Sequence, residues 1–175
     1  MIISLIGFMG TGKSAVGKEL AERLNYQHLD TDREIEKRTG RSIPEIFERE
    51  GEEYFRKLES ELLKDILEDN GEIVLSTGGG IVLSPLNRKL LKEKSIPVLL
   101  EAGAREIYER VKNDTHRPLL RVSDPLAEIE NLLAERKEYY HEFNLRIKTD
   151  GLEIEEIAED ILDRLEFLDE EGMRK

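Results

Sequence analysis

Cysteine is absent from the 175 residues of this chain, and histidine occurs only three times. Without cysteine the chain can form neither a disulfide bond nor a thiolate metal site. His28, His116 and His141 are widely spaced, which argues against a zinc site built on histidine. These shortages exclude disulfide scaffolds and thiolate zinc proteins.

Positive charge and long apolar runs are also scarce. The chain has 27 Lys and Arg against 39 Asp and Glu, a formal net charge of −12. Such a surface repels phosphate backbones and anionic lipids, so neither nucleic acid nor a membrane is expected as a partner. No apolar run approaches the roughly 20 residues of a membrane span, and Met1 leads directly into a strand-like segment with no basic leader. We therefore expect a cytoplasmic protein.

Strand-like and helical segments alternate along the chain. The strand-like segments are 2–6, 26–29, 73–76, 97–101 and 145–148, and amphipathic helices are predicted over 13–24, 52–67 and 153–167. Helix starts are indicated by the capping-box spacing at Ser42 and by Asp124 followed by proline. This alternation predicts an α/β fold, with a parallel sheet covered by helices on both faces.

The sequence shows no sign of a boundary between domains, because no repeat, low-complexity tract or linker rich in Pro, Gly or Ser is present. We expect a single domain over residues 1–175. Two stretches without a predicted strand, about 33–60 and about 112–124, are interpreted as insertions, which is where binding sites and lids tend to lie.

The segment 7–14, Gly-Phe-Met-Gly-Thr-Gly-Lys-Ser, fits the eight-residue P-loop pattern between a predicted strand and a predicted helix. Its glycines let the backbone wrap around phosphate oxygens, and the start of the helix adds amide groups and a positive dipole. Lys13 is expected to reach the β and γ phosphates of a nucleoside triphosphate, and Ser14 to hold Mg²⁺. A glycine-rich turn that only caps a helix would leave both residues unexplained. The predicted nucleotide-binding residues here are Gly10, Thr11, Gly12, Lys13, Ser14 and Ala15.

Two carboxylates, Asp30 and Asp32, stand at the end of the second predicted strand, on the side of an open α/β sheet where ligands bind. Asp32 is suited to accept the proton of a substrate hydroxyl, and Asp30 to help hold Mg²⁺ through water. Capping of a helix over 34–39 explains the same residues equally well.

Three consecutive glycines, Gly78, Gly79 and Gly80, follow the strand-like segment 73–76. They suggest backbone amides brought close to a ligand, with a plain flexible turn as the alternative. No aspartate follows this strand, where many P-loop proteins carry one. A water-mediated contact to Mg²⁺ must therefore come from elsewhere, which favours Asp30.

Basic side chains gather in the segment 110–121 of this otherwise acidic chain. Its Asn, Asp and Pro residues indicate a loop, and we expect a lid that brings Arg117 over the γ-phosphate and excludes water. A solvated charged loop is the alternative. Arg56 and Arg136 lie on predicted helices, where the residues alone favour an ordinary exposed arginine paired with a neighbouring glutamate such as Glu59 over a ligand contact.

Taken together, these motifs resemble the shikimate kinase family over about residues 1–150. They are the P-loop, Asp30-Thr31-Asp32, the segment 51–59 (Gly-Glu-Glu-Tyr-Phe-Arg-Lys-Leu-Glu), the three glycines, Arg117-Pro118-Leu119 and Arg136. The resemblance implies a P-loop NTPase three-layer sandwich of the nucleoside monophosphate kinase type, with a five-stranded parallel sheet, a substrate-binding insertion and a lid. It also implies a monomer that uses ATP and Mg²⁺ to phosphorylate the 3-hydroxyl of shikimate, in the route to chorismate and the aromatic amino acids.

The resemblance further implies a role for each motif residue. Those expected at the nucleotide and Mg²⁺ are Lys13, Ser14, Asp30, Arg117 and, stacked near the adenine, Arg110. Those expected at shikimate are Asp32, which activates the hydroxyl, Arg56 and Arg136, which bind the carboxylate, and Glu59, Gly78, Gly79 and Gly80, which line the pocket. Catalysis itself is assigned to Lys13, Asp32 and Arg117.

Two other functions stay open on the residues alone. One is another small-molecule kinase of the same fold, such as a gluconate kinase or a nucleotide kinase. The other is a non-catalytic P-loop module that acts as a switch, although a pure binder needs neither the proton acceptor Asp32 nor a basic lid. The segment 149–152 is short where family members often have a longer adenine-contacting loop, so the preferred nucleotide is not fixed by the resemblance.

Overall fold

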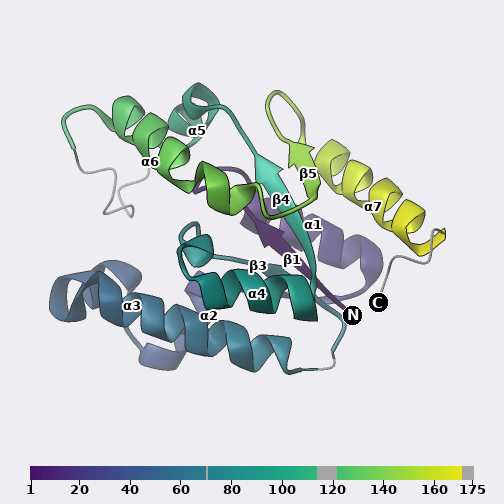
Figure 1. Cartoon of the computed structure of the whole chain (residues 1–175), viewed down its shortest axis with the longest axis horizontal. Helices are drawn as coiled ribbons and strands as arrows, with labels where there is room; N and C mark the ends of the chain where they lie inside the picture. Colours follow the sequence, from purple (N-terminus) through teal and green to yellow (C-terminus); the bar gives the residue numbers. More distant parts are fainter. Residues whose placement is uncertain (70, 114–121, 171–175) are drawn as a thin grey trace.

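The computed structural model describes residues 1–69, 71–113 and 122–170 (Figure 1). Its strands are β1 (Ile2–Ile6), β2 (Gln27–Asp30), β3 (Ile73–Ser76), β4 (Ile96–Glu101) and β5 (Leu145–Lys148). Its helices are α1 (Lys13–Leu24), α2 (Thr31–Thr39), α3 (Ile43–Leu67), α4 (Pro85–Lys94), α5 (Ala104–Val111), α6 (Pro125–Tyr140) and α7 (Ile154–Glu170), and a short 3-10 helix, η1 (Ile81–Leu83), precedes α4.

The five strands form one parallel sheet in the order β2-β3-β1-β4-β5, which confirms the predicted α/β fold. Three of the strands have the predicted bounds, whereas β2 begins one residue later than expected and β4 one residue earlier. The connection that leaves β1 leads to the edge strand β2, whereas the connection that leaves β3 crosses β1 to reach β4, so the chain changes direction between the neighbouring strands β1 and β3. In open α/β sheets this reversal opens a crevice at the carboxyl ends of the strands.

Helices cover both faces of the sheet and enclose a hydrophobic core on each side (Figure 1). Alternate residues of β1 point to opposite layers: Ile3 and Leu5 pack with α1 and α7, whereas Ile2 and Ile6 belong to the cluster shared with α3, α4 and α6. Every residue of β1 is buried, as expected for a central parallel strand. The predicted three-layer sandwich is confirmed.

The first insertion folds as two helices, α2 and the beginning of α3. Ser42 starts α3 with a capping box, in which its backbone N–H donates to Glu45 Oε2 at 2.8 Å and its hydroxyl accepts from the Glu45 backbone N–H. Gly51 has φ 84° and kinks the helix. The helix predicted from residue 52 onward is therefore only the second part of α3, because the turn at Gly51 hides the continuity between the two parts.

The other predicted helix ends agree with the structure to within a few residues. Asp124 caps α6 by accepting a hydrogen bond from the Ala127 backbone N–H at 3.1 Å, as its position before proline indicated. The last helix, α7, extends to Glu170, beyond the predicted end at residue 167. Within the part of the chain that the structure describes, no helix has the length and apolar character needed to cross a membrane.

Candidate active site

The P-loop leaves the carboxyl end of β1 and leads into α1. Gly10 and Gly12 have φ 77° and 92°, a region that favours glycine, and a Cβ on Gly10 would also lie 2.7 Å from Val111 Cγ1. The Lys13 side chain folds back into the loop, where Nζ donates to the carbonyl oxygens of Gly7 at 2.9 Å and Phe8 at 2.7 Å. The loop thus holds a buried ammonium group at the crevice.

Asp30 caps α2, as one of its two interpretations predicted, and its carboxylate also faces the P-loop. Its Oδ1 accepts from the backbone N–H of Asp32 at 3.0 Å, and its Oδ2 accepts from the Ser14 hydroxyl at 2.6 Å. Asp32 itself lies in the first turn of α2 rather than at the end of the strand. The hydroxyl of Ser14 and the carboxylate of Asp30 form the kind of oxygen pair that Mg²⁺ prefers.

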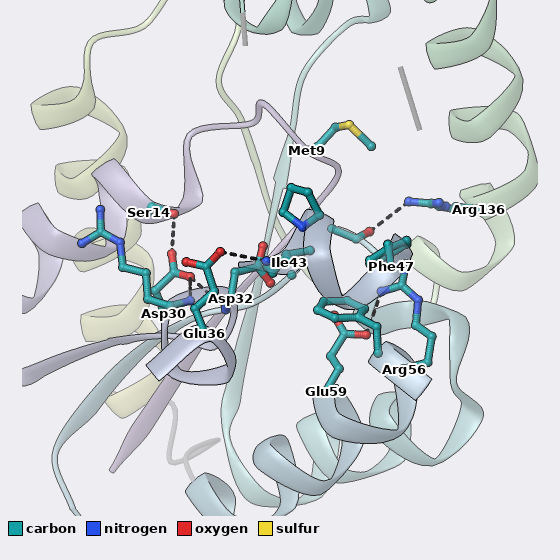
Figure 2. A pocket seen from close by; sticks show the side chains of 16 residues that line it. Met9, Ser14, Asp30, Asp32, Glu36, Ile43, Phe47, Arg56, Glu59 and Arg136 are labelled. Carbon is teal, nitrogen blue, oxygen red and sulfur yellow. Dashed lines mark hydrogen bonds and ion pairs between the residues drawn. The ribbon is translucent and has the colours of Figure 1, made fainter. Parts of the chain in front are cut away.

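A cavity of about 550 Å³ opens next to this pair (Figure 2). Its walls come from the P-loop, α2, α3, the turn after β3, and α6, and its volume suits a small metabolite. The structure brings all of the residues predicted at shikimate together here. They are Asp32, Arg56, Glu59, Gly78, Gly79, Gly80 and Arg136.

Arg56 lines the cavity while it pairs with two glutamates of its own helix. Its Nη1 donates to Glu59 Oε2 at 2.9 Å and its Nη2 to Glu52 Oε1 at 2.9 Å. The plain pairing expected on a helix is therefore present, but it does not exclude ligand contact. A Cβ on Gly80 would overlap the guanidinium, so only glycine allows Arg56 to approach this turn.

Arg136 is not the ordinary exposed arginine that its helical position allowed, because only 4% of its surface is exposed. Its Nη1 donates to the Gly79 carbonyl at 3.1 Å, and its guanidinium carbon lies 5.3 Å from the centroid of the Phe8 ring. Within the described residues, its Nε has no hydrogen-bond partner. A buried donor with positive charge at a cavity wall favours an anionic ligand.

Glu59 is fully buried between Arg56 and the turn after β3. Burial raises the pKa of this carboxyl to about 7, although the charge and hydrogen bond of Arg56 oppose the rise. The charge of Asp32 raises the pKa further, whereas Arg136 lowers it. A Cβ on Gly78 would overlap Glu59 Oε1 and lie 2.8 Å from Asp32 Oδ1, so both carboxyl groups converge on this glycine.

We expect Glu59→Gln to raise the melting temperature at about pH 8 by roughly 7–14 °C, and to have little effect near pH 4. The pKa of Glu59 in the folded state, about 7, is above the ordinary value of 4.5 for a glutamate carboxyl. The folded state therefore binds the proton more tightly than the unfolded chain, and its stability falls as pH rises from about 4.5 to 7. The Glu59→Gln variant has no ionisable group at this position, so this loss of stability with rising pH does not occur in it. Scanning calorimetry of both proteins across this pH range would measure the difference.

Glu61→Gln provides the matched control, because Glu61 lies on the same helix with its side chain 60% exposed. Its pH dependence should follow that of the wild-type protein. If the Glu59 variant also followed the wild-type curve at every pH, the raised pKa would be wrong.

Arg110 connects the P-loop to the turn after β5, at the nucleotide end of the crevice. Its Nη1 donates to the Gly10 carbonyl at 3.3 Å and to Thr149 Oγ1 at 3.1 Å, and its Nη2 donates to the Thr149 carbonyl at 2.7 Å. Arg117 and most of the predicted lid lie outside the described residues. Ala15 is exposed on the first turn of α1, directly after Ser14.

Several residues of the cavity were not singled out by the sequence. Met9, Arg33, Glu36 and Phe47 all line it. Glu36 joins the two helices of the insertion, because its Oε1 accepts from the Ile43 backbone N–H at 2.9 Å. Phe47 packs on Phe55 across the kink, with ring centroids 5.0 Å apart. No motif marked Arg33, Glu36 or Phe47, since only the fold of the insertion brings them to the cavity, whereas Met9 occupies a variable position of the P-loop pattern.

Comparisons with known proteins agree with this geometry. A family model described as "SKI: Shikimate kinase" matches residues 9–166. A shikimate kinase of Thermodesulfovibrio yellowstonii is 44% identical over 166 residues, 95% of each chain. The solved structure of a shikimate kinase from Acinetobacter baumannii in complex with shikimate has a TM-score of 0.90 and 38% identity, and the match covers 94% of this chain and 92% of that one. A gluconokinase from Sinorhizobium meliloti has a TM-score of 0.59 at 17% identity, covering 98% of this chain and 94% of that one, which shows a shared fold alone.

Proposed function

The chain belongs to the shikimate kinase family, and we propose from this premise how the side chains of its site act. The protein is an enzyme that transfers a phosphoryl group from ATP to the 3-hydroxyl of shikimate, giving shikimate 3-phosphate and ADP. The main observation in favour of shikimate as the substrate is the cavity beside the P-loop, where Arg56 and Arg136 lie opposite Asp32 (Figure 2). Two guanidinium groups suit a carboxylate, and a nearby carboxylate suits the hydroxyl that reacts.

The P-loop binds the nucleotide in this proposal. Amide groups of Gly10, Thr11, Gly12, Lys13, Ser14 and Ala15 surround the phosphates, and the Lys13 ammonium reaches the β and γ phosphates. Arg117 comes from the lid to the γ-phosphate. The position of Arg110, between the P-loop and the turn after β5, supports a contact near the adenine.

A kinase of this family needs a divalent metal ion, and we assign it as Mg²⁺. The hydroxyl of Ser14 would hold it directly and Asp30 through water. The 2.6 Å hydrogen bond between these groups supports the fit, because both offer hard oxygen atoms at one place. When bound, the ion neutralises charge on the phosphates. Among the described residues, no group of three or more acidic or histidine side chains forms a metal site. Mg²⁺ bound to ATP phosphates needs only one or two protein ligands.

At the other end of the cavity, the shikimate carboxylate binds Arg56 and Arg136. The unpaired Nε of Arg136 supports this role, because a carboxylate satisfies it. Gly78, Gly79 and Gly80 let the side chains and the substrate approach the turn closely, and Glu59 orients Arg56.

As the oxygen of the shikimate 3-hydroxyl attacks the γ-phosphorus of ATP, Asp32 accepts the proton of this hydroxyl. The bond between that phosphorus and the bridging oxygen of ADP breaks in the same step. This role is supported by the position of Asp32, which lines the cavity together with Ser14 and Asp30.

We further propose a monomer of one domain that works in the cytoplasm. The continuous parallel sheet, to which segments from β1 through β5 contribute, supports a single domain. The resemblance to the family supports the monomer, and the use of ATP as phosphoryl donor fits the cytoplasm.

Release of ADP from Mg-ATP in the presence of shikimate tests the assignment. We expect release with shikimate and none above background with gluconate, with nucleoside monophosphates or without an acceptor. Release of ADP with a different acceptor would support a kinase activity but contradict shikimate as its substrate. Folded protein that binds ATP but releases ADP with no acceptor in this panel would favour the switch module.

A further inference from the structure

Arg88, on α4, lies at the junction of three elements without lining the cavity. Its side chain is only 12% exposed. Its Nη1 donates to the Val82 carbonyl at 2.6 Å, and its Nε donates to Glu142 Oε1 at 2.7 Å. Its guanidinium carbon lies 4.5 Å from the centroid of the Tyr139 ring. One side chain thus connects α4, the end of η1, and the C-terminal end of α6.

The segment from Gly78 to η1 forms the surface on which the proposed shikimate-binding side chains rest. A Cβ on Gly78 would overlap Glu59 Oε1, and a Cβ on Gly80 would overlap the Arg56 guanidinium, so both side chains lie close against this segment. At its far end, this segment is held by α4, where Arg88 and the buried Asn87 together bond to carbonyls of η1. A displacement of η1 would therefore move the whole segment relative to the arginines.

The helix α6 meets the same segment at two levels. Near the cavity, Arg136 Nη1 and the Tyr140 hydroxyl both donate to the Gly79 carbonyl, at 3.1 and 3.5 Å. Beside these contacts, Arg88 lies against the Tyr139 ring in the last turn of α6 and bonds to Glu142, two residues after the end of α6. Glu142 receives Arg88 on one carboxyl oxygen and Lys92 on the other, at 2.7 and 2.5 Å. The contacts at the Gly79 carbonyl involve Arg136, which we assign to the substrate. The contacts of Arg88 lie outside the set of residues that line the cavity.

We propose that Arg88 is a positioning residue for the acid-binding end of the site. It fixes the distance between η1 and α6, and thereby sets where Arg136 and the Gly79 carbonyl face the cavity. This inference rests on the proposed role of Arg136 at the substrate carboxylate. Hydrogen bonds from a charged group in a mostly buried setting are strong enough to hold such a spacing. A bridge that serves only fold stability would instead lower the melting temperature and leave ligand affinity unchanged.

The test compares Arg88→Ala with Arg146→Ala in the full-length enzyme. Arg146 forms a partly buried bridge to Glu101 between β4 and β5, at 2.7 Å, on the sheet edge away from η1. Both variants should melt several degrees lower than the wild-type protein. Titration calorimetry should show that Arg88→Ala binds shikimate roughly tenfold more weakly, while a slowly hydrolysed ATP analogue binds as before. Arg146→Ala should keep both affinities.

Glu142→Gln provides a milder variant if Arg88→Ala fails to fold. It removes the charge that Arg88 and Lys92 share and should weaken shikimate binding in the same direction by a smaller factor. A double-mutant cycle with Arg136→Lys tests whether Arg88 acts on shikimate binding through Arg136. Because both changes act on one carboxylate contact, the double variant Arg88→Ala, Arg136→Lys should lose less affinity than the product of the single losses.

Unchanged shikimate affinity in folded Arg88→Ala, or in folded Glu142→Gln when Arg88→Ala does not fold, would overturn the inference and leave the proposed function intact. Independent losses in the cycle would also overturn it, because Arg88 would then not act through Arg136. Wild-type protein that binds no shikimate would overturn the proposed function first, and this inference with it.

Discussion

Replacing Lys13 by alanine should lower kcat for phosphoryl transfer by about 10³-fold or more. The transferred group passes through a state in which negative charge spreads over its oxygens, and a fixed positive charge nearby stabilises it. Lys13 is only 8% exposed, and the carbonyls of Gly7 and Phe8 hold its side chain in the P-loop. Because the loop is already folded around this ammonium group, no other described side chain of the loop can replace its charge. Coupled measurement of ADP production at saturating shikimate and ATP would give the change.

Lys18→Ala is the matched control for this experiment. Lys18 lies on the same helix, and its side chain is 73% exposed and pairs only loosely with Glu22, at 4.0 Å. This variant should keep wild-type turnover. A melting curve must first show that Lys13→Ala is folded. Near-normal turnover in the folded Lys13→Ala protein would remove Lys13 from the catalytic role.

The parts of the site that the sequence predicted well are those encoded by short, continuous segments. The P-loop needs glycine where φ is positive and a lysine at the start of a helix, so its residues indicate both the conformation of the loop and its phosphate-binding chemistry. The strands β1 and β3 were found with their true bounds, because buried parallel strands are continuous apolar runs. The position of Asp30 at the end of β2 followed from the same alternation.

The parts that the sequence could not supply depend on segments that meet only in the folded chain. Arg136 looked like any arginine on a helix, and its burial arises because α6 packs against the turn after β3. The convergence of Glu59 and Asp32 on Gly78 joins α3, α2 and that turn. No sequence pattern pointed to Arg88, because its partners are backbone carbonyls of η1 and a ring and a carboxylate at the C-terminal end of α6.

The kink at Gly51 shows the same limit within one helix. The sequence separated a helix start at Ser42 from an amphipathic helix beginning at residue 52, and the structure joins them through a residue with φ 84°. The bend places Phe47 beside Phe55 at the cavity wall. A local pattern shows that glycine interrupts the periodicity, but not the direction in which the chain turns.

Asp32→Asn should lower kcat by about 10²- to 10⁴-fold while shikimate binds almost as before. Asparagine keeps the shape of the side chain and can still hydrogen-bond to a hydroxyl, but it cannot accept the proton. Asp32 lines the cavity at the start of α2, where its backbone N–H is fixed by Asp30. Titration calorimetry with shikimate and steady-state kinetics would separate affinity from turnover.

Asp65→Asn is a suitable control, because Asp65 lies on α3 with a side chain 56% exposed and pairs with Arg38 outside the cavity. It should not affect turnover. Two outcomes for folded Asp32→Asn would contradict the proposed role in different ways. Retained kcat with weakened binding would make Asp32 a substrate-orienting residue only, since a loose transition state can release its proton late. Retained kcat and affinity together would place the reacting hydroxyl elsewhere in the cavity, and Glu59, whose carboxyl group converges on Gly78 with that of Asp32, would become the next residue to replace.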